Sequence, residues 1–173
     1  MSRTKDENDP LSEEIRECNA YAPDLAVDIH NNAGGGDGAE AFYHYGGGKS
    51  KTLAENILAE IVKVGQNSRG AKIRKNSQGK DYYGFIRETV CPSTIIEVCF
   101  VDNATDLQIL ATSSDRRKVG QAVAKGILMT LGIAIQSDRL YRVQVGAYSD
   151  KSNAEAMLEK LKASGFSGYI KQE

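Results

Sequence analysis

An apolar run with one carboxylate at its centre constrains the fold more than any other stretch of this sequence. Residues 93–101 read STIIEVCFV, and Glu97 is the only acidic or basic side chain among them. Continuous apolar runs of this length are typical of strands that are buried on both faces. A buried carboxylate without a partner is costly, so Glu97 needs a cation, a metal-bound water or a proton. The alternative is a glutamate at the end of a sheet whose carboxylate reaches solvent.

A second strand is predicted over residues 24–30, which read DLAVDIH and precede a loop rich in glycine and asparagine. Alternation places the apolar side chains on one face and Asp28 and His30 on the other. Ligands of open α/β sheets bind outside the carboxyl ends of strands, and glycines let a backbone approach them closely. His30 is therefore either a metal ligand or acid–base group, or a hydrogen-bonded histidine at a strand end. Together with Glu97 it suggests a metal-assisted hydrolytic site.

Strands that alternate with helical periodicity predict a layered α/β domain. Helices are expected near residues 10–20, 50–64, 105–110 and 115–131, and further strands near 39–45, 71–75 and 82–89. A strand–helix–strand pattern restarts over 140–172. We therefore expect an α/β domain over 1–134, a linker over 135–138 and a small βαβ appendage over 139–173, which is short for an independent core.

The composition offers no electrostatic argument for binding nucleic acid or an anionic membrane, because the net charge is −1 and charges of both signs are interspersed. No apolar run reaches membrane-spanning length, and the polar residues 1–10 show no signal peptide. The cysteines are Cys18, Cys91 and Cys99. Their odd number and spacing argue against a disulfide framework, and the apolar strand around Cys99 predicts an unreactive core thiol.

Two polar stretches each have two interpretations. Residues 46–50, GGGKS, resemble the end of a phosphate-binding loop, but that motif requires a glycine where this chain has Tyr43. A loop that leads into a helix beginning near Ser50 is the favoured interpretation. Residues 69–80 are basic, with Arg69, Lys72, Arg74, Lys75 and Lys80. This second stretch is either a solvated face or the wall of a groove for an anionic polymer.

Several motifs, in order, resemble the zinc-dependent N-acetylmuramoyl-L-alanine amidases, which are bacterial and phage enzymes that lyse the cell wall. They are SRT at 2–4, DLAVDIHNNA at 24–33, GAE at 38–40, RGAK at 69–72 and IIEVCFVDN at 95–103. The resemblance runs from about residue 2 to 132 and implies a three-layer fold, in which helices flank a twisted sheet. Residues 141–148, YRVQVGAY, are similar to the opening half of a SPOR peptidoglycan-binding domain.

This resemblance implies hydrolysis of the amide bond between N-acetylmuramic acid and L-alanine in peptidoglycan. Zn²⁺ is the implied cofactor. His30 matches a zinc-binding histidine, and Glu97 matches the catalytic glutamate. The family's first strand and first helix carry the other two zinc ligands and precede the region matched here. We therefore expect an N-terminally truncated catalytic domain and half a SPOR domain, with weak zinc binding and poor cleavage by this chain alone.

Two other functions remain open at this point. One is a non-catalytic peptidoglycan-binding remnant, and the other is a metal-dependent hydrolase or peptidase of another substrate. His44, the second histidine, has no ligand role in the family and is expected to be packed or at the surface. Peptidoglycan is the expected partner, with neither nucleic acid nor membrane insertion. The expected place of action is the bacterial cell wall, after synthesis in the cytoplasm or after secretion directed by residues absent from this sequence.

Overall fold

The computed structural model describes residues 10–134 and 143–172. The chain divides into two compact units, Met1–Ile135 and Gln136–Glu173. The linker expected over 135–138 lies outside the described residues. Each unit is described by itself below.

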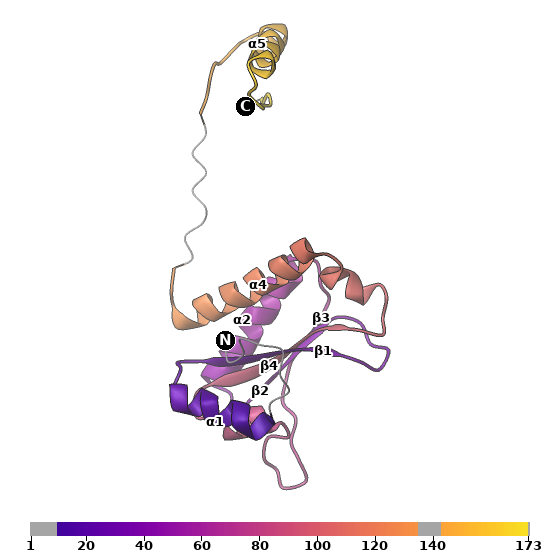
Figure 1. Cartoon of the computed structure of the whole chain (residues 1–173), viewed down its shortest axis with the longest axis vertical. Helices are drawn as coiled ribbons and strands as arrows, with labels where there is room; N and C mark the ends of the chain where they lie inside the picture. The colour runs from indigo at the N-terminus through magenta and orange to yellow at the C-terminus, as the bar shows by residue number, and fades with distance from the viewer. Residues whose placement is uncertain (1–9, 135–142, 173) are drawn as a thin grey trace. The chain divides into compact units, whose positions relative to one another are not determined.

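The first unit is built around a mixed four-stranded sheet in the order β1-β4-β2-β3 (Figure 1). The strands are β1 (Ala26–Asn32), β2 (Ala39–Tyr43), β3 (Ser68–Lys72) and β4 (Ser93–Phe100). β4 runs parallel to β1 and antiparallel to β2, and β2 runs parallel to β3. The apolar run at 93–101 thus forms an interior strand, as its continuous hydrophobicity predicts. β1 lies at an edge of the sheet.

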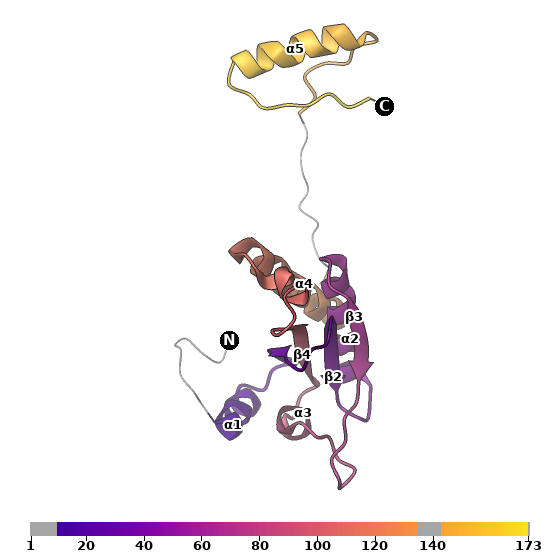
Figure 2. The same cartoon turned by 90° about the vertical axis from the view of Figure 1, so that its right-hand side faces the viewer.

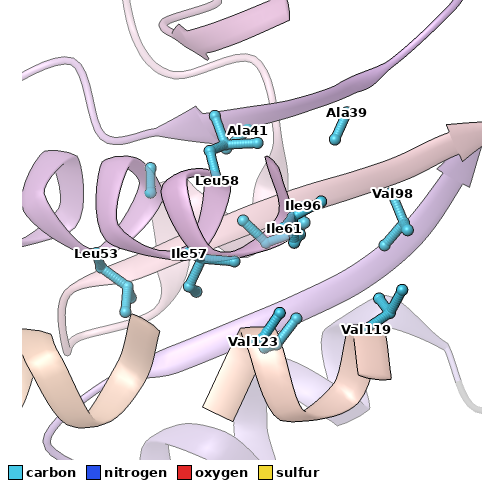
Figure 3. Close-up of a cluster of buried hydrophobic side chains, with 12 residues drawn as sticks. Ala39, Ala41, Leu53, Ile57, Leu58, Ile61, Ile96, Val98, Val119 and Val123 are labelled. Carbon is cyan, nitrogen blue, oxygen red and sulfur yellow. The ribbon is translucent and has the colours of Figure 1, made fainter. Parts of the chain in front are cut away.

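One face of the sheet is covered by the helices α2 (Lys49–Lys63) and α4 (Ser113–Leu131). Side chains at helical spacing meet the alternate residues of β2 and β4 in the main core (Figure 3), so the amphipathic helices expected over 50–64 and 115–131 are confirmed. The core contains Ala39, Ala41, Leu53, Ala54, Ile57, Leu58, Ile61, Ile96, Val98, Val119, Ala122 and Val123.

Local sequence explains where α4 begins and ends. The Thr112 side chain accepts a hydrogen bond from the Asp115 backbone, and the Asp115 carboxylate accepts one from the Thr112 backbone, which together form a capping box. Hydrogen bonds from Thr112 and Lys118 lower the pKa of Asp115 to about 2. Gly132 ends the helix in the left-handed conformation, with a φ of 69°.

The other face of the sheet carries a third layer that contains α1 (Leu11–Tyr21) and α3 (Gly84–Glu88) (Figure 2). Ile86 of α3 packs with Phe42 and Ile95, which point away from the main core. The extended segment expected over 82–89 is therefore wrong, because this short run forms a helical turn that buries Ile86 against the sheet. The three-layer α/β architecture is confirmed.

The carboxyl end of β4 is held by Asp106, the first residue of the 3₁₀ helix η1 (Asp106–Leu110). Its buried carboxylate accepts hydrogen bonds from the Phe100 backbone N–H at 2.6 Å and from Gln66 Nε2 at 2.5 Å. Such donors stabilise a buried carboxylate, so Asp106 secures the carboxyl end of β4, the strand that contains Glu97.

The second unit is described over residues 143–172, and its regular element is α5 (Lys151–Ala163). Asp150 caps this helix by accepting a hydrogen bond from the Ser152 backbone N–H at 2.9 Å. The strands expected on either side are not formed over 143–148 or 168–172. Isolated pairs of strands are marginal without a buried face, and α5 has no buried residue to provide one. The described helices include none that is long and apolar enough to cross a membrane.

Candidate hydrolytic site

His30, Glu97 and Glu40 lie in a row across three neighbouring strands. His30 is the register partner of Glu97 in the parallel β1–β4 pair, and Glu40 is its partner in the antiparallel β2–β4 pair. Paired residues project from the same face of a sheet. Because the alternate residues of β4 enter the main core, this row projects from the opposite face. The sheet therefore brings together the two candidate residues identified from the sequence.

Glu97 is half-buried at the centre of this row. Its Oε2 atom is buried and has no hydrogen-bond partner among the described residues. Burial raises the pKa of Glu97, and the charges of Glu40 and Asp28 act in the same direction, while His30 opposes them. A carboxyl group that holds its proton to higher pH than usual is suited to accepting and returning a proton in a reaction.

His30 is oriented by a carboxylate on its own strand. Its Nε2 atom lies 2.9 Å from Oδ2 of Asp28, two residues earlier, where alternation places both side chains on one face. The imidazole is 55% exposed, so an ion or substrate can reach it. A histidine held by a carboxylate is a frequent arrangement around bound metals, because the carboxylate fixes the orientation of the ring.

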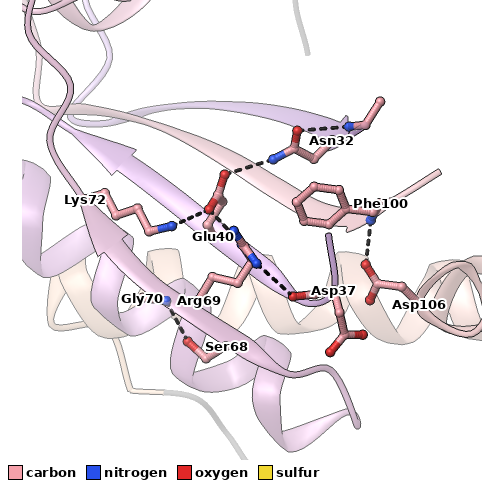
Figure 4. Close-up of polar contacts among 10 residues, drawn as sticks. Asn32, Asp37, Glu40, Ser68, Arg69, Gly70, Lys72, Phe100 and Asp106 are labelled. Carbon is pink, nitrogen blue, oxygen red and sulfur yellow. Dashed lines mark hydrogen bonds and ion pairs between the residues drawn. The ribbon is translucent and has the colours of Figure 1, made fainter. Parts of the chain in front are cut away.

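Glu40 is a buried carboxylate that serves a different role (Figure 4). It accepts hydrogen bonds from Asn32 Nδ2 at 2.8 Å, from Arg69 Nε at 3.0 Å, and from Lys72 Nζ. Burial alone would raise the pKa of Glu40, but the hydrogen bonds and charges of Lys72 and Arg69 outweigh it and hold the pKa below its ordinary value. The site therefore contains two adjacent carboxylates whose pKa values are displaced in opposite directions, which is typical of acid–base sites.

The role of Glu40 was not recognised from the sequence. The available signal was one acidic residue inside the strand AEAFY together with the basic motif RGAK of the neighbouring strand. Two cations of the basic stretch, Arg69 and Lys72, thus bind Glu40. Further along, Arg74 stacks on Tyr82 at 3.9 Å and Lys75 lies 4.5 Å from the ring centre of Tyr45.

The glycine loop that follows β1 is fastened to the end of β4. Asp102 Oδ2 accepts hydrogen bonds from the backbone N–H groups of Gly34 at 2.7 Å and Gly35 at 2.9 Å, and these bonds lower the pKa of Asp102. Both glycines have positive φ, of 118° and 73°, which other residues rarely adopt. Asn103 Nδ2 also donates to the carbonyl of Gly36. These hydrogen bonds therefore attach the loop beside the carboxyl ends of β1 and β4.

His44 lies outside this row, after the carboxyl end of β2. Its Nδ1 accepts a hydrogen bond from the Gly46 backbone N–H at 3.0 Å, and its Nε2 lies 3.2 Å from Oδ2 of the buried Asp81. It is a partly exposed structural histidine, in agreement with the sequence-based expectation.

A catalytic zinc ion takes three protein ligands and keeps one position open. His30 offers one imidazole in this region. Among residues 10–134 and 143–172, no group of three His, Cys, Asp or Glu side chains is arranged to hold a metal ion. The described residues therefore do not fit a complete zinc site. The SRT motif at residues 2–4 lies outside the described part of the chain.

Comparison with known families gives two matches. The family model for N-acetylmuramoyl-L-alanine amidase matches residues 1–129, and that for the SPOR domain matches residues 116–172. Among curated proteins, the N-acetylmuramoyl-L-alanine amidase CwlM of Bacillus licheniformis is 30% identical over 98% of this chain. A sporulation-specific N-acetylmuramoyl-L-alanine amidase of Bacillus subtilis is 29% identical over 98% of the chain. The chain spans 65% of the length of each relative.

Solved structures share the fold of the first unit. Cwp6 from Clostridium difficile superimposes with a TM-score of 0.74 and 34% identity, over 76% of this chain and 22% of that protein. An N-acetylmuramoyl-L-alanine amidase from Clostridium difficile 630 superimposes with a TM-score of 0.65 and 26% identity, over 76% of this chain and 70% of that one.

Proposed function

Because this chain belongs to the N-acetylmuramoyl-L-alanine amidase family, whose model matches residues 1–129, we propose that it hydrolyses the amide bond between N-acetylmuramic acid and L-alanine in peptidoglycan. The observation that carries the proposal is the pairing of His30 with Glu97 on adjacent strands, where Glu97 has a buried, unpartnered carboxyl oxygen within the described structure. Glu97 is the proposed catalytic residue, and His30 is the proposed metal-binding residue.

In this proposal Glu97 transfers the proton of the reaction, first as a general base and then as a general acid. Its Oε2 atom accepts the proton of the attacking water and delivers it to the nitrogen of the leaving L-alanine. The raised pKa of Glu97 favours both steps, because the group holds the proton between them. Glu40 remains ionised through its contacts with Arg69 and Lys72, and its charge contributes to that raised pKa.

The walls of the proposed substrate groove are the Gly34–Gly38 loop and the basic stretch over 69–80. The loop offers backbone that a substrate can approach closely, and Asp102 holds it in place. Two cations of the stretch over 69–80 lie against half-exposed tyrosines outside it, Arg74 against Tyr82 and Lys75 against Tyr45. This combination suits a substrate that has both sugar rings and carboxylates.

Zinc is the proposed cofactor, with His30 as one ligand. Because the described residues supply no group of three donors, we expect this chain alone to bind zinc weakly and to turn over substrate slowly. Equilibrium dialysis against zinc, followed by elemental mass spectrometry, tests this expectation. One tightly held zinc ion per chain would contradict it.

A second candidate function is non-catalytic binding of peptidoglycan. The absence of a three-donor metal group among the described residues favours it, as does the match to the SPOR domain over 116–172. In this case the chain binds the wall through the groove and the C-terminal module. Its place of action is the cell wall under either proposal.

One assay separates these functions. The full chain is incubated with purified peptidoglycan and excess zinc, and both new amino groups and sedimentation with the wall are measured. Amidase activity releases new amino groups, and Glu97→Gln should abolish this release. The matched control Glu55→Gln changes an exposed residue of α2 and should leave the rate unchanged. Sedimentation without new amino groups would support the binding function instead. Cleavage of peptides that lack muramic acid at a comparable rate would overturn the substrate assignment.

A further inference from the structure

Two of the cysteines that are far apart in the sequence meet in the third layer of the first unit. Cys18 lies in α1, and Cys91 lies in the connection between α3 and β4, 73 residues later (91 − 18). Hydrogen bonds from Asn19 to Glu88 and Val90 place the two segments side by side, and Cys18 is near enough to raise the pKa of the Cys91 thiol. Both cysteines are partly exposed. The spacing of the cysteines in the sequence does not indicate this proximity, because it arises only from the way α1 packs.

The backbone on both sides of this thiol pair is fixed. Asn19, next to Cys18, donates from Nδ2 to the Glu88 carbonyl at 2.9 Å and accepts from the Val90 backbone N–H at 2.9 Å. On the other side of Cys91, the carbonyl of Pro92 accepts a hydrogen bond from the Ala26 backbone N–H at 3.0 Å. The two Asn19 hydrogen bonds hold α1 beside the segment that contains Cys91, and the Pro92 hydrogen bond ties that segment to β1. The two thiols therefore stay near each other.

We propose that Cys18 and Cys91 form a reversible intramolecular disulfide that fastens α1 to the segment leading into β4. With a small-molecule disulfide such as oxidised glutathione as oxidant, one cysteine thiolate attacks a glutathione sulfur and releases one glutathione. The second cysteine thiolate then attacks the mixed disulfide at the protein sulfur and releases the other glutathione. Two protein thiols are oxidised, one small disulfide is reduced to two thiols, and the two protons pass to those products.

The third cysteine provides an internal control. Cys99 is fully buried in β4, and its thiol donates a hydrogen bond to Asn31 Oδ1 at 3.4 Å. It lies eight residues beyond Cys91 (99 − 91) along a mainly extended segment, which spans roughly 25 Å and is too far for a disulfide. Oxidation of the folded chain is therefore confined to Cys18 and Cys91.

The disulfide closes a long loop of the chain and so restricts the unfolded state. We expect the oxidised protein to melt at a temperature higher by about 5 °C or more than the reduced protein. Burial and the neighbouring Cys18 raise the pKa of Cys91, so the reaction should be slow near neutral pH and faster as the pH rises and more thiolate forms.

The test uses the full chain with oxidised glutathione at mildly alkaline pH. We expect free thiols to fall from three to one per chain, intact-protein mass spectrometry to show the loss of two hydrogen atoms, and peptide mapping to link Cys18 to Cys91. Dithiothreitol should restore all three thiols. Cys99→Ser should retain the melting-temperature shift, whereas Cys18→Ser and Cys91→Ser should each lose it.

Several outcomes would overturn the proposal. One is the persistence of three free thiols in the folded chain under conditions that oxidise the urea-unfolded chain. Others are two stable glutathione adducts, a link to Cys99, or disulfide-bonded dimers in place of the intramolecular product. Each of these outcomes is measured by mass spectrometry and peptide mapping, without any assay of peptidoglycan turnover. The test therefore remains valid even if the proposed amidase activity is absent.

Discussion

The substitution Gly126→Ala probes the contact that joins α2 to α4. A Cβ atom on Gly126 would lie 2.5 Å from the Cα atom and 2.7 Å from the backbone nitrogen of Ile57. Carbon atoms in ordinary contact are about 3.5–4.0 Å apart. Because backbone atoms cannot rotate away, the two helices would have to separate by about 1 Å at the centre of the main core.

The size of the effect follows from two opposing terms. In an unobstructed helix, replacing glycine with alanine stabilises a protein by about 1 kcal/mol. Overpacking a core costs about 1–3 kcal/mol, and a backbone-to-backbone clash belongs at the upper end of that range. We therefore expect Gly126→Ala to lower the free energy of unfolding by about 2 kcal/mol, which corresponds to a loss of roughly 5–10 °C in melting temperature.

Gly120→Ala is the matched control, because it lies in the same helix and an added Cβ would meet no atom within 4 Å. It should raise the free energy of unfolding by about 0.5–1 kcal/mol. Urea denaturation followed by circular dichroism measures both variants. The reasoning is refuted if Gly126→Ala is as stable as Gly120→Ala, since the Ile57 backbone would then not obstruct the new methyl group.

Three further predictions concern the candidate site. Because the pKa of Glu97 is raised in the folded state, the folded chain keeps this proton at pH values above 4.5 where the unfolded chain loses it. Wild-type stability therefore falls as the pH rises from 4.5 to the folded-state pKa of Glu97. Glu97→Gln should therefore be more stable than wild type in urea denaturation at pH 7, with the advantage absent at pH 4. The lowered pKa of Glu40 has the opposite sign: its stabilisation is present above pH 4.5 and is lost as the pH falls through its folded-state pKa. Glu40→Gln should cost about 1–2 kcal/mol at neutral pH, because two cations lose their shared acceptor, and an equal loss at pH 3 would contradict this. Asp102→Ala should accelerate hydrogen exchange at the Gly34 and Gly35 amides, and unchanged exchange there would show that the loop is held by other contacts.

Much of the first unit could be predicted from local patterns. The apolar run around Glu97 predicted an interior strand, and helical spacing located α2 and α4, because burial imposes these periodicities directly on the sequence. Short segments were less predictable. Within the strand expected over 82–89, residues Gly84–Glu88 form the helix α3, because Ile86 is buried against side chains of β2 and β4 that are distant in the sequence.

The sequence by itself determined that His30 and Glu97 are chemically unusual: His30 ends a predicted strand just before a glycine loop, and Glu97 interrupts an apolar run. Only the tertiary structure decided that they are register partners, that Glu40 lies beside them with Arg69 and Lys72, and that Cys18 meets Cys91. The physical reason is that strand register and helix docking depend on how the whole core packs. A shift of one residue in β4 would turn Glu97 to the opposite face of the sheet.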